Sequence, residues 1–363
     1  MRGDESRGTS HESRVSAWPP QRIALFRALQ LGDMLCTVPA WRALRAAFPD
    51  AHITLIALPW ARDLALRYSR YLDDYLEFPG APGLPERDAD IDAYPAFLDA
   101  VRSRRFDLIV QMHGSGELTN PLVAQWGAAR IAGYSRDPDG AGEHATLLRW
   151  DDREHEVRRF LRLAAALGAP PCGEHLEFPI RAAEHDAIAH ALDGIGDRFV
   201  CIHPGARYPS RRWPPERFAA VADALADRGL QVLVTGATDE RPLAEAVIRR
   251  MRHAAIDYTG FTTLGTFAAL VTRARLVVSN DTGMAHVAAA VHAPSVVVSS
   301  GADAARWRAL DESRHRTLWH DVHCRPCMHF TCPTGHECAL GVSVEAVLAQ
   351  AAWLLDGETA RAA

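Results

Sequence analysis

The feature that most constrains the fold of this chain is a unit that recurs along it. In this unit an apolar run of strand length leads through a small-residue turn into a helical pattern. In the first half, residues 22–27 form such a run, a helical pattern covers 34–48, and a strand resumes at 52–58. In the second half, the run 199–202 leads to a helical pattern at 215–228. Because strands that alternate with helices usually pair in parallel, the pattern predicts an α/β fold with two doubly wound parallel sheets.

The length of the chain predicts more than one domain. A chain of 363 residues is too long for one ordinary hydrophobic core. We expect an N-terminal domain at 19–190 and a C-terminal domain at 191–363, which ends in an amphipathic helix at 343–355. Residues 1–18 are polar and charged without an apolar centre, which predicts a disordered leader and neither a signal peptide nor a membrane anchor.

The composition narrows the classes of function. With 48% hydrophobic and 23% charged residues, the chain is typical of a soluble globular protein. A formal net charge of -5 gives no global electrostatic reason to expect nucleic-acid binding. No apolar stretch is long enough to span a bilayer. We therefore expect a cytoplasmic protein, with shallow attachment to a membrane surface left open.

A segment of small and polar residues in the second half is the strongest candidate for a binding site. It follows the apolar run 274–278 and leads straight into a short apolar helix. The first N–H groups of a helix have no internal partners and carry partial positive charge, so this position suits an anion. Thr282 adds a hydroxyl, Gly283 allows close approach, and His286 lies on the same helical face as Thr282. Alternatively, Asp281 or Thr282 only caps the helix and His286 is a surface residue.

A Gly32-Asp33 pair ends the first strand of the first half. A carboxylate at that place could take a proton from a bound hydroxyl. Alternatively, Asp33 caps a helix that begins at Met34.

Charged residues follow two strands of the second half. Three arginines lie within 207–213, after the first strand, where their forked donors would suit a diphosphate. Glu240 follows the next strand and could accept hydrogen bonds from a ribose. Alternatively, the arginines form a solvated charge run, and Glu240 is a first-turn residue favoured by the helix dipole. Neither Gly-x-Gly-x-x-Gly after the first strand nor Gly-x4-Gly-Lys-Ser/Thr is present, which argues against a dinucleotide dehydrogenase and a P-loop enzyme.

Four of the seven cysteines crowd together near the C-terminus. They are Cys324, Cys327, Cys332 and Cys338. In a reducing compartment such a cluster indicates a metal clamp or a set of free thiols and not a disulfide pair. The spacing is shorter than that of most structural zinc sites, and His323, His329 and His336 could also serve as ligands. Whether the cluster binds a structural metal stays open.

Taken together, these segments resemble glycosyltransferase family 9, the ADP-heptose:lipopolysaccharide heptosyltransferases. The resemblance extends from residue 22 to about residue 347, and the order and spacing of its pieces make it specific. The pieces are Leu31–Asp33 with Val38–Ala40, His203–Ala206, Arg212–Pro214, Thr235–Gly236 with Glu240, Thr259–Leu264, and Asp281–Gly283 with His286. The cysteine group also looks like one found in part of this family.

The resemblance implies a GT-B fold, in which two Rossmann-like domains face a cleft. It implies an inverting, metal-independent transfer that needs no cofactor, from the donor ADP-heptose to a lipopolysaccharide inner-core acceptor. Contact with the cytoplasmic face of the inner membrane is left open, and so are the acceptor sugar and the oligomeric state.

By resemblance, Asp33 matches the general base that deprotonates the acceptor hydroxyl. Asp281 matches a residue near the donor sugar. Thr282, Gly283 and His286 match the diphosphate site.

The rest of the implied donor site lies earlier in the second half. Gly205 and Ala206 fall in a loop that approaches the phosphates, Glu240 matches a ribose contact, and the backbone of Thr262 would border adenine. Many members carry lysine where this chain has Arg211, which keeps the charge, changes the geometry and leaves the donor identity open.

Two other functions remain as alternatives. One is a related enzyme, either a sugar-nucleotide epimerase or a transferase that uses a different nucleotide sugar. The other is a non-catalytic nucleotide-sugar-binding protein. Asp33 together with the 281–286 segment disfavours a pure binder, since a binder needs no base. The arginines between Arg149 and Arg162 could meet acceptor phosphates or form a solvated helix face.

Overall fold

The computed structural model describes residues 19–140, 142 and 144–362, and describes no side chains at 140 or 358–362. The expected leader, 1–18, lies outside the described residues. The contacts divide the chain into two compact units. The first contains the described residues up to Gln30 and Thr37–Glu174, and the second contains Leu31–Cys36 and the chain from His175 onward.

The first unit is built on a six-stranded sheet of order β3-β2-β1-β4-β5-β6, in which every pairing is parallel. Its strands are β1 (Arg22–Phe26), β2 (His52–Ala57), β3 (Asp74–Glu77), β4 (Leu108–Gln111), β5 (Arg130–Ser135) and β6 (Ala145–Arg149). Its helices are α2 (Val38–Ala47), α3 (Arg62–Arg67), α4 (Tyr94–Ser103), α5 (Thr119–Ala124) and α6 (Glu156–Ala166), with short 3-10 turns η2 (Pro59–Ala61) and η3 (Pro138–Gly140).

The second unit contains a six-stranded parallel sheet of order β12-β11-β10-β7-β8-β9. Its strands are β7 (Phe199–His203), β8 (Gln231–Val234), β9 (Ile256–Asp257), β10 (Leu276–Asn280), β11 (Ser295–Val298) and β12 (His315–Leu318). Its helices are α1 (Leu31–Leu35), α7 (Ala182–Ala191), α8 (Pro215–Asp227), α9 (Arg241–Ile248), α10 (Leu264–Arg273), α11 (Gly283–Ala290), α12 (Ala304–Trp307), α13 (Glu337–Leu340) and α14 (Val344–Ala362), with 3-10 turns η4 (Pro209–Arg211) and η5 (Thr238–Glu240).

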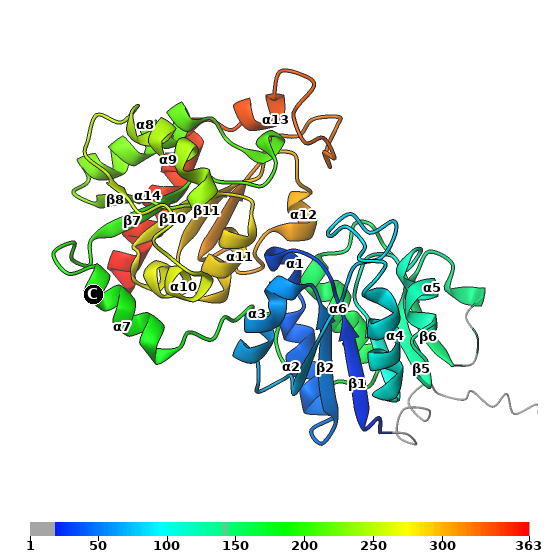
Figure 1. The fold of residues 1–363 in the computed structure, drawn as a ribbon. Helices are drawn as coiled ribbons and strands as arrows, with labels where there is room; N and C mark the ends of the chain where they lie inside the picture. The colour runs from blue at the N-terminus through cyan, green and yellow to red at the C-terminus, as the bar shows by residue number, and fades with distance from the viewer. Residues whose placement is uncertain (1–18, 141, 143, 363) are drawn as a thin grey trace, which may run out of the picture. The chain divides into compact units, whose positions relative to one another are not determined.

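Both sheets have the same strand order, in which the chain starts in the middle, winds to one edge and then returns to wind to the other (Figure 1). This is the doubly wound arrangement, and the predicted α/β fold class is confirmed. The order reverses between β1 and β4 in the first unit and between β7 and β10 in the second. Ligands of such sheets bind outside the carboxyl ends of the strands at that reversal.

The two cores are chemically different. In the first unit, the aromatic rings of Phe26, Phe97 and Trp126 pack edge to face, with centroids 4.9 Å apart for Phe26 and Trp126 and 5.3 Å apart for Phe97 and Trp126. In the second unit, β10 is buried along its whole length, and valines of the neighbouring strands pack against α8 and α14. A strand covered on both faces reads as a continuous apolar run, which is why these strands could be predicted.

Some predicted elements have different limits. The helix expected at 34–48 is two helices, because the chain turns at Cys36 and Thr37, and Pro39 lies in the first turn of α2. The helix after the 281–286 segment begins at Gly283, so His286 belongs to its first turns. Helix α7 packs against α10 within the second unit, and by contacts the division of the chain falls between Glu174 and His175.

No helix among the described residues is both long enough and apolar enough to cross a bilayer.

Candidate functional site

The candidate site of the second unit is built at the carboxyl ends of β7 and β10. Asn280, the last residue of β10, is fully buried. Its amide Nδ2 donates to the Pro204 carbonyl (2.8 Å), and its Oδ1 accepts from the Trp213 N–H (2.9 Å). One buried side chain therefore ties the turn after β7 to the end of β10. Sequence reasoning missed Asn280, although a polar amide directly after an apolar strand was a signal that could have found it.

The 281–286 segment holds an unused hydroxyl. Thr282 occupies the N-cap position of α11, but its side chain makes no capping hydrogen bond. Its Oγ1 is buried and has no hydrogen-bond partner. Asp281, one residue earlier, accepts a hydrogen bond from Ser299 Oγ (2.8 Å). Thr282 is therefore the N-cap residue by position, as the alternative reading held, but its hydroxyl does not cap the helix and is left for another partner.

His286 and Asp33 meet in the second unit, where α1 packs against α11. The His286 ring lies so close to Gly32 that a β-carbon there would be 2.6 Å from its Cδ2. Its Nδ1 lies 3.7 Å from Cys36 Sγ. Burial lowers the pKa of His286, and the nearby carboxylates of Asp281 and Asp33 oppose that shift. Asp33 lies inside α1, so it does not cap a helix that begins at Met34.

A second cluster forms between the turn after β7 and η5. The Glu240 carboxylate lies over Gly205, where a β-carbon would be 2.2 Å from Oε1. Glu240 Oε2 accepts from the Ala237 N–H (2.9 Å) and lies 3.9 Å from His203 Nε2. Burial lowers the pKa of His203, against the influence of Glu240. Glu240 is therefore a first-turn residue of η5, as the alternative reading held, and its Oε2 caps the turn.

The remaining predicted donor residues lie in the adjoining loops. Ala206 is buried next to Gly205, and its carbonyl accepts from Arg212 Nε (2.9 Å). Arg211 ends η4, where its Nη2 donates to the Cys327 carbonyl (2.5 Å) and its Nε is buried without a hydrogen-bond partner. Thr262 lies partly buried before α10, in a loop held beside η5 by the hydrogen bond from Gly260 N to the Gly236 carbonyl (2.9 Å).

These features share one physical property. Within the described part of the second unit, six side-chain polar atoms are buried without a hydrogen-bond partner. They are Arg211 Nε, Thr259 Oγ1, Ser279 Oγ, Thr282 Oγ1, Ser300 Oγ and Arg325 Nε. All six lie at the end of a strand of the second sheet or in the chain that follows one. Each such atom costs about 1–3 kcal/mol while it is unpaired, so a ligand rich in polar atoms would be stabilised wherever it reached them. Sequence reasoning missed Ser300 and Arg325, which no motif marked.

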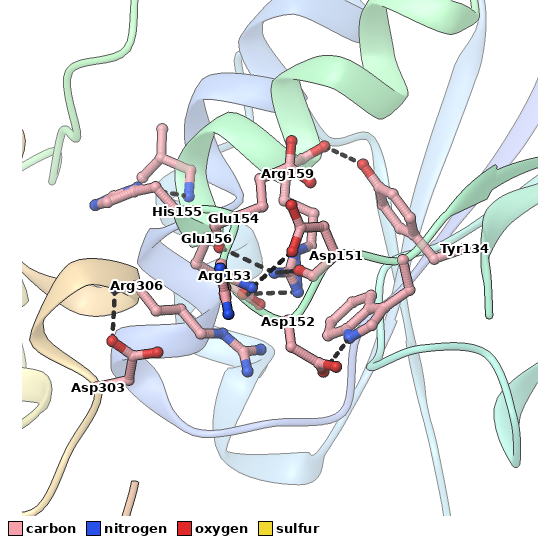
Figure 2. Close-up of polar contacts among 12 residues, drawn as sticks. Tyr134, Asp151, Asp152, Arg153, Glu154, His155, Glu156, Arg159, Asp303 and Arg306 are labelled. Carbon is pink, nitrogen blue, oxygen red and sulfur yellow. Dashed lines mark hydrogen bonds and ion pairs between the residues drawn. The ribbon is translucent and has the colours of Figure 1, made fainter. Parts of the chain in front are cut away.

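The carboxyl edge of the first sheet is held by a buried ion-pair network around α6. Arg27 Nη2 contacts Glu156 Oε1 at 3.0 Å, and Arg159 Nη1 contacts Glu156 Oε2 at 3.4 Å. Arg159 also donates to the carbonyls of Asp151 and Glu154, at 2.6 and 2.9 Å (Figure 2). Arg159 is fully buried, so it does not form part of a solvated face, and its hydrogen bonds hold the loop before α6.

His113 follows β4 in the same unit. Its Nδ1 accepts from the Ala28 N–H (3.3 Å), and its Nε2 lies 3.8 Å from Glu86 Oε2. Burial, helped by the charge of Arg27, lowers its pKa to about 3. His113 is therefore a neutral imidazole at neutral pH.

The clustered cysteines line one small pocket of about 140 Å³ together with His323 and His329. Their thiols are free. Among the described residues, no group of three or more His, Cys, Asp or Glu side chains is arranged to hold a metal ion. Metal binding by this cluster thus stays an open prediction.

Comparison with known proteins gives a consistent result. Residues 95–337 match a family model described as glycosyltransferase family 9 (heptosyltransferase). The chain is 24% identical over 300 residues to lipooligosaccharide heptosyltransferase 2 of Haemophilus ducreyi, covering 77% of this chain and 82% of that protein. Its fold is similar to that of a family 9 glycosyltransferase from Veillonella parvula, with a TM-score of 0.77, 22% identity, and coverage of 93% of this chain and 98% of that one. Its fold is also similar to that of the ADP-heptose lipopolysaccharide heptosyltransferase II of E. coli, with a TM-score of 0.71 and 21% identity. This match covers 93% of this chain and 99% of that one.

Proposed function

Because the chain belongs to glycosyltransferase family 9, the heptosyltransferases, we propose that it transfers a heptose from ADP-heptose to an acceptor sugar of the lipopolysaccharide inner core. The predicted family is confirmed, and so is the GT-B type of fold with its two doubly wound sheets. Heptosyltransferases with similar sequences support the choice of donor and acceptor.

One observation in this chain carries the proposal. The buried Thr282 hydroxyl has no partner, and it lies at the start of α11, whose first N–H groups also lack internal partners. Arg211 Nε is a second buried donor without a partner. A diphosphate offers several charged oxygen acceptors, which would satisfy both groups and interact favourably with the helix dipole. A nucleoside diphosphate sugar is thus a ligand whose chemistry fits this edge.

The other donor contacts follow from the same arrangement. Gly205 and Ala206 would present their backbone to the phosphates. Only glycine at 205 leaves room for the Glu240 carboxylate. Since Glu240 uses Oε2 to cap its turn, Oε1 would accept a hydrogen bond from a ribose hydroxyl. Thr262, in the loop beside η5, would border the adenine through its backbone.

The chemical step would be an in-line displacement. The acceptor oxygen attacks the anomeric carbon while Asp33 takes the hydroxyl proton, and the bond from that carbon to the diphosphate breaks. Asp33 and Asp281 each lie within electrostatic range of His286. A buried, neutral His286 adds no positive charge beside the Asp33 carboxylate, and we assign Asp33 the role of the base.

The departing diphosphate needs stabilisation of its negative charge. We expect fixed N–H groups of α11 and the guanidinium of Arg211 to supply it, so that catalysis needs no metal ion or other cofactor. Because the acceptor is lipid-linked, transfer would also involve peripheral contact with the cytoplasmic face of the inner membrane.

Product analysis by mass spectrometry tests the function. The purified protein is incubated with ADP-heptose and a set of truncated core lipids, with other nucleotide sugars as matched donors and Asp33→Ala as the inactive control. The expected result is one core lipid that gains a single heptose, with release of ADP. Transfer from a different nucleotide sugar, an isomerised donor, or binding without any turnover would each contradict the proposal.

A further inference from the structure

The cysteine-rich segment, residues 322–338, is hydrogen-bonded to the 3-10 turn that carries Arg211. Four hydrogen bonds join the two: Ser210 N to the Phe330 carbonyl (3.1 Å), Ser210 Oγ to the His329 carbonyl (2.5 Å), His336 Nε2 to the Ser210 carbonyl (3.0 Å), and Arg211 Nη2 to the Cys327 carbonyl (2.5 Å). The turn η4 is therefore fixed through both its backbone and its side chains.

The central residues of this contact are held firmly. Ser210 is only 2% exposed. Because a carbonyl oxygen can only accept, His336 must carry its proton on Nε2 to make its bond. His336 has a left-handed backbone, with φ of 57°, which costs energy for a residue other than glycine and persists only where the surroundings impose it.

The same segment is also attached to the loop that follows β11. The Cys327 N–H donates to the Gly301 carbonyl (2.7 Å), and Arg325 Nη2 donates to the Ser299 carbonyl (3.0 Å). Ser299 in turn donates to Asp281 in the proposed donor site. The segment thus connects the loop after β7 with the loop after β11, and Arg211 lies where the two meet.

The arginine itself explains why this connection matters. With Nη2 engaged by the Cys327 carbonyl, the planar guanidinium is fixed, while its Nε donor is buried and has no hydrogen-bond partner. An arginine can hold a carbonyl with one edge and an anion with another, whereas the single ammonium of a lysine has no fixed fork. Holding such a side chain in place before the ligand arrives lowers the cost of binding.

We propose that the cysteine-rich segment positions Arg211 for the donor diphosphate, with Ser210 and His336 as positioning residues that never touch the donor. This inference rests on the proposed function of the site. It assigns a role to the one sequence motif that the catalytic account leaves unused, and it gives a reason for arginine at a position where many family members carry lysine.

A double-mutant cycle in the full-length protein tests the proposal. Ser210→Ala removes the hydroxyl bond, and His336→Gly removes the imidazole without left-handed strain. Loss of one hydrogen bond predicts an increase of about three- to tenfold in the KM for ADP-heptose and in the Kd for ADP, with kcat little changed. Met328→Ala, which truncates an exposed side chain of the same segment, is the matched control and should leave KM unchanged.

The Arg211→Ala background separates positioning from general stability. If Ser210 and His336 act through Arg211, neither substitution should raise KM further in that background, even where it lowers the melting temperature. A further increase of the same size in the Arg211→Ala protein would overturn the inference, and so would an unchanged KM in the single variants. In both cases wild-type transfer would leave the proposed function standing. A wild-type protein that neither binds ADP nor transfers heptose would overturn the proposed function and this inference with it.

Discussion

Replacing Thr282 with valine should make the protein more stable and a weaker binder of its donor. Valine keeps the shape of threonine and removes only the hydroxyl. That hydroxyl is buried, makes no capping hydrogen bond and has no other partner. A buried hydroxyl without a partner costs about 1–3 kcal/mol, so the change should raise the free energy of unfolding by about 1 kcal/mol. For a domain of 150–250 residues this raises the melting temperature by roughly 2–4 °C.

The same substitution should weaken ADP binding. A hydrogen bond to a charged phosphate contributes about 1.5–3 kcal/mol, which corresponds to a Kd about 10- to 150-fold higher. Thermal unfolding with and without ADP measures both effects in one experiment, and isothermal titration calorimetry gives the Kd directly. The expected signature is a higher melting temperature without ligand and a smaller rise on adding ADP.

Thr119→Val in the first unit is the matched control. Thr119 is 2% exposed, and its hydroxyl donates to the His113 carbonyl at 2.9 Å. Its removal should therefore destabilise the protein and leave ADP binding unchanged. If Thr282→Val destabilises the protein as Thr119→Val does, the Thr282 hydroxyl is already satisfied and the reasoning about a prepared anion site is refuted.

Three further predictions concern the donor site, the first unit and metal ions. Gly205→Ala places a β-carbon 2.2 Å from Glu240 Oε1 and should raise the KM for ADP-heptose. The control Gly357→Ala places its β-carbon in open space and should leave this KM unchanged. Equal KM values for the two variants would contradict the ribose contact of Glu240. Burial lowers the pKa of His113 from 6.5 to about 3, so as the pH falls the unfolded chain is protonated at His113 before the folded protein, and the folded protein loses stability between pH 6.5 and 3. In urea unfolding at a series of pH values, the free energy of unfolding of His113→Gln should therefore fall less steeply across this range than that of wild type. An equal slope in the two proteins would contradict the prediction. EDTA should leave turnover unchanged, and a lost rate that magnesium restores would refute metal-independent transfer.

Much of the fold could be predicted because buried parallel strands leave a clear signal. Runs such as 199–202 and 276–278 are apolar on both faces, and each ends in small or polar residues. Short or mixed strands such as β3 and β12 left no such signal and were missed. The helix was expected to follow the 281–286 segment, but α11 begins inside that segment, because Gly283 and its neighbours read as a turn.

The candidate site was less predictable, because contacts between distant residues decide it. The polar residues after β7 and β10 could be found from their positions at strand ends. The sequence contains no sign that residues 31–36 pack with the second unit, or that Glu240 lies over Gly205. The same holds for the hydrogen bonds between Ser210 and the cysteine-rich segment, which are more than 100 positions apart in the chain.

The central claim is that the Asp33 carboxylate removes the acceptor proton while the α11 turn holds the donor phosphates. The most direct test compares Asp33→Ala with wild type in two assays, single-turnover heptose transfer and ADP binding by calorimetry. The account predicts that transfer is abolished while the Kd for ADP stays close to that of wild type. Loss of ADP binding in parallel with transfer would show that residue 33 supports the structure of the site and is not its base.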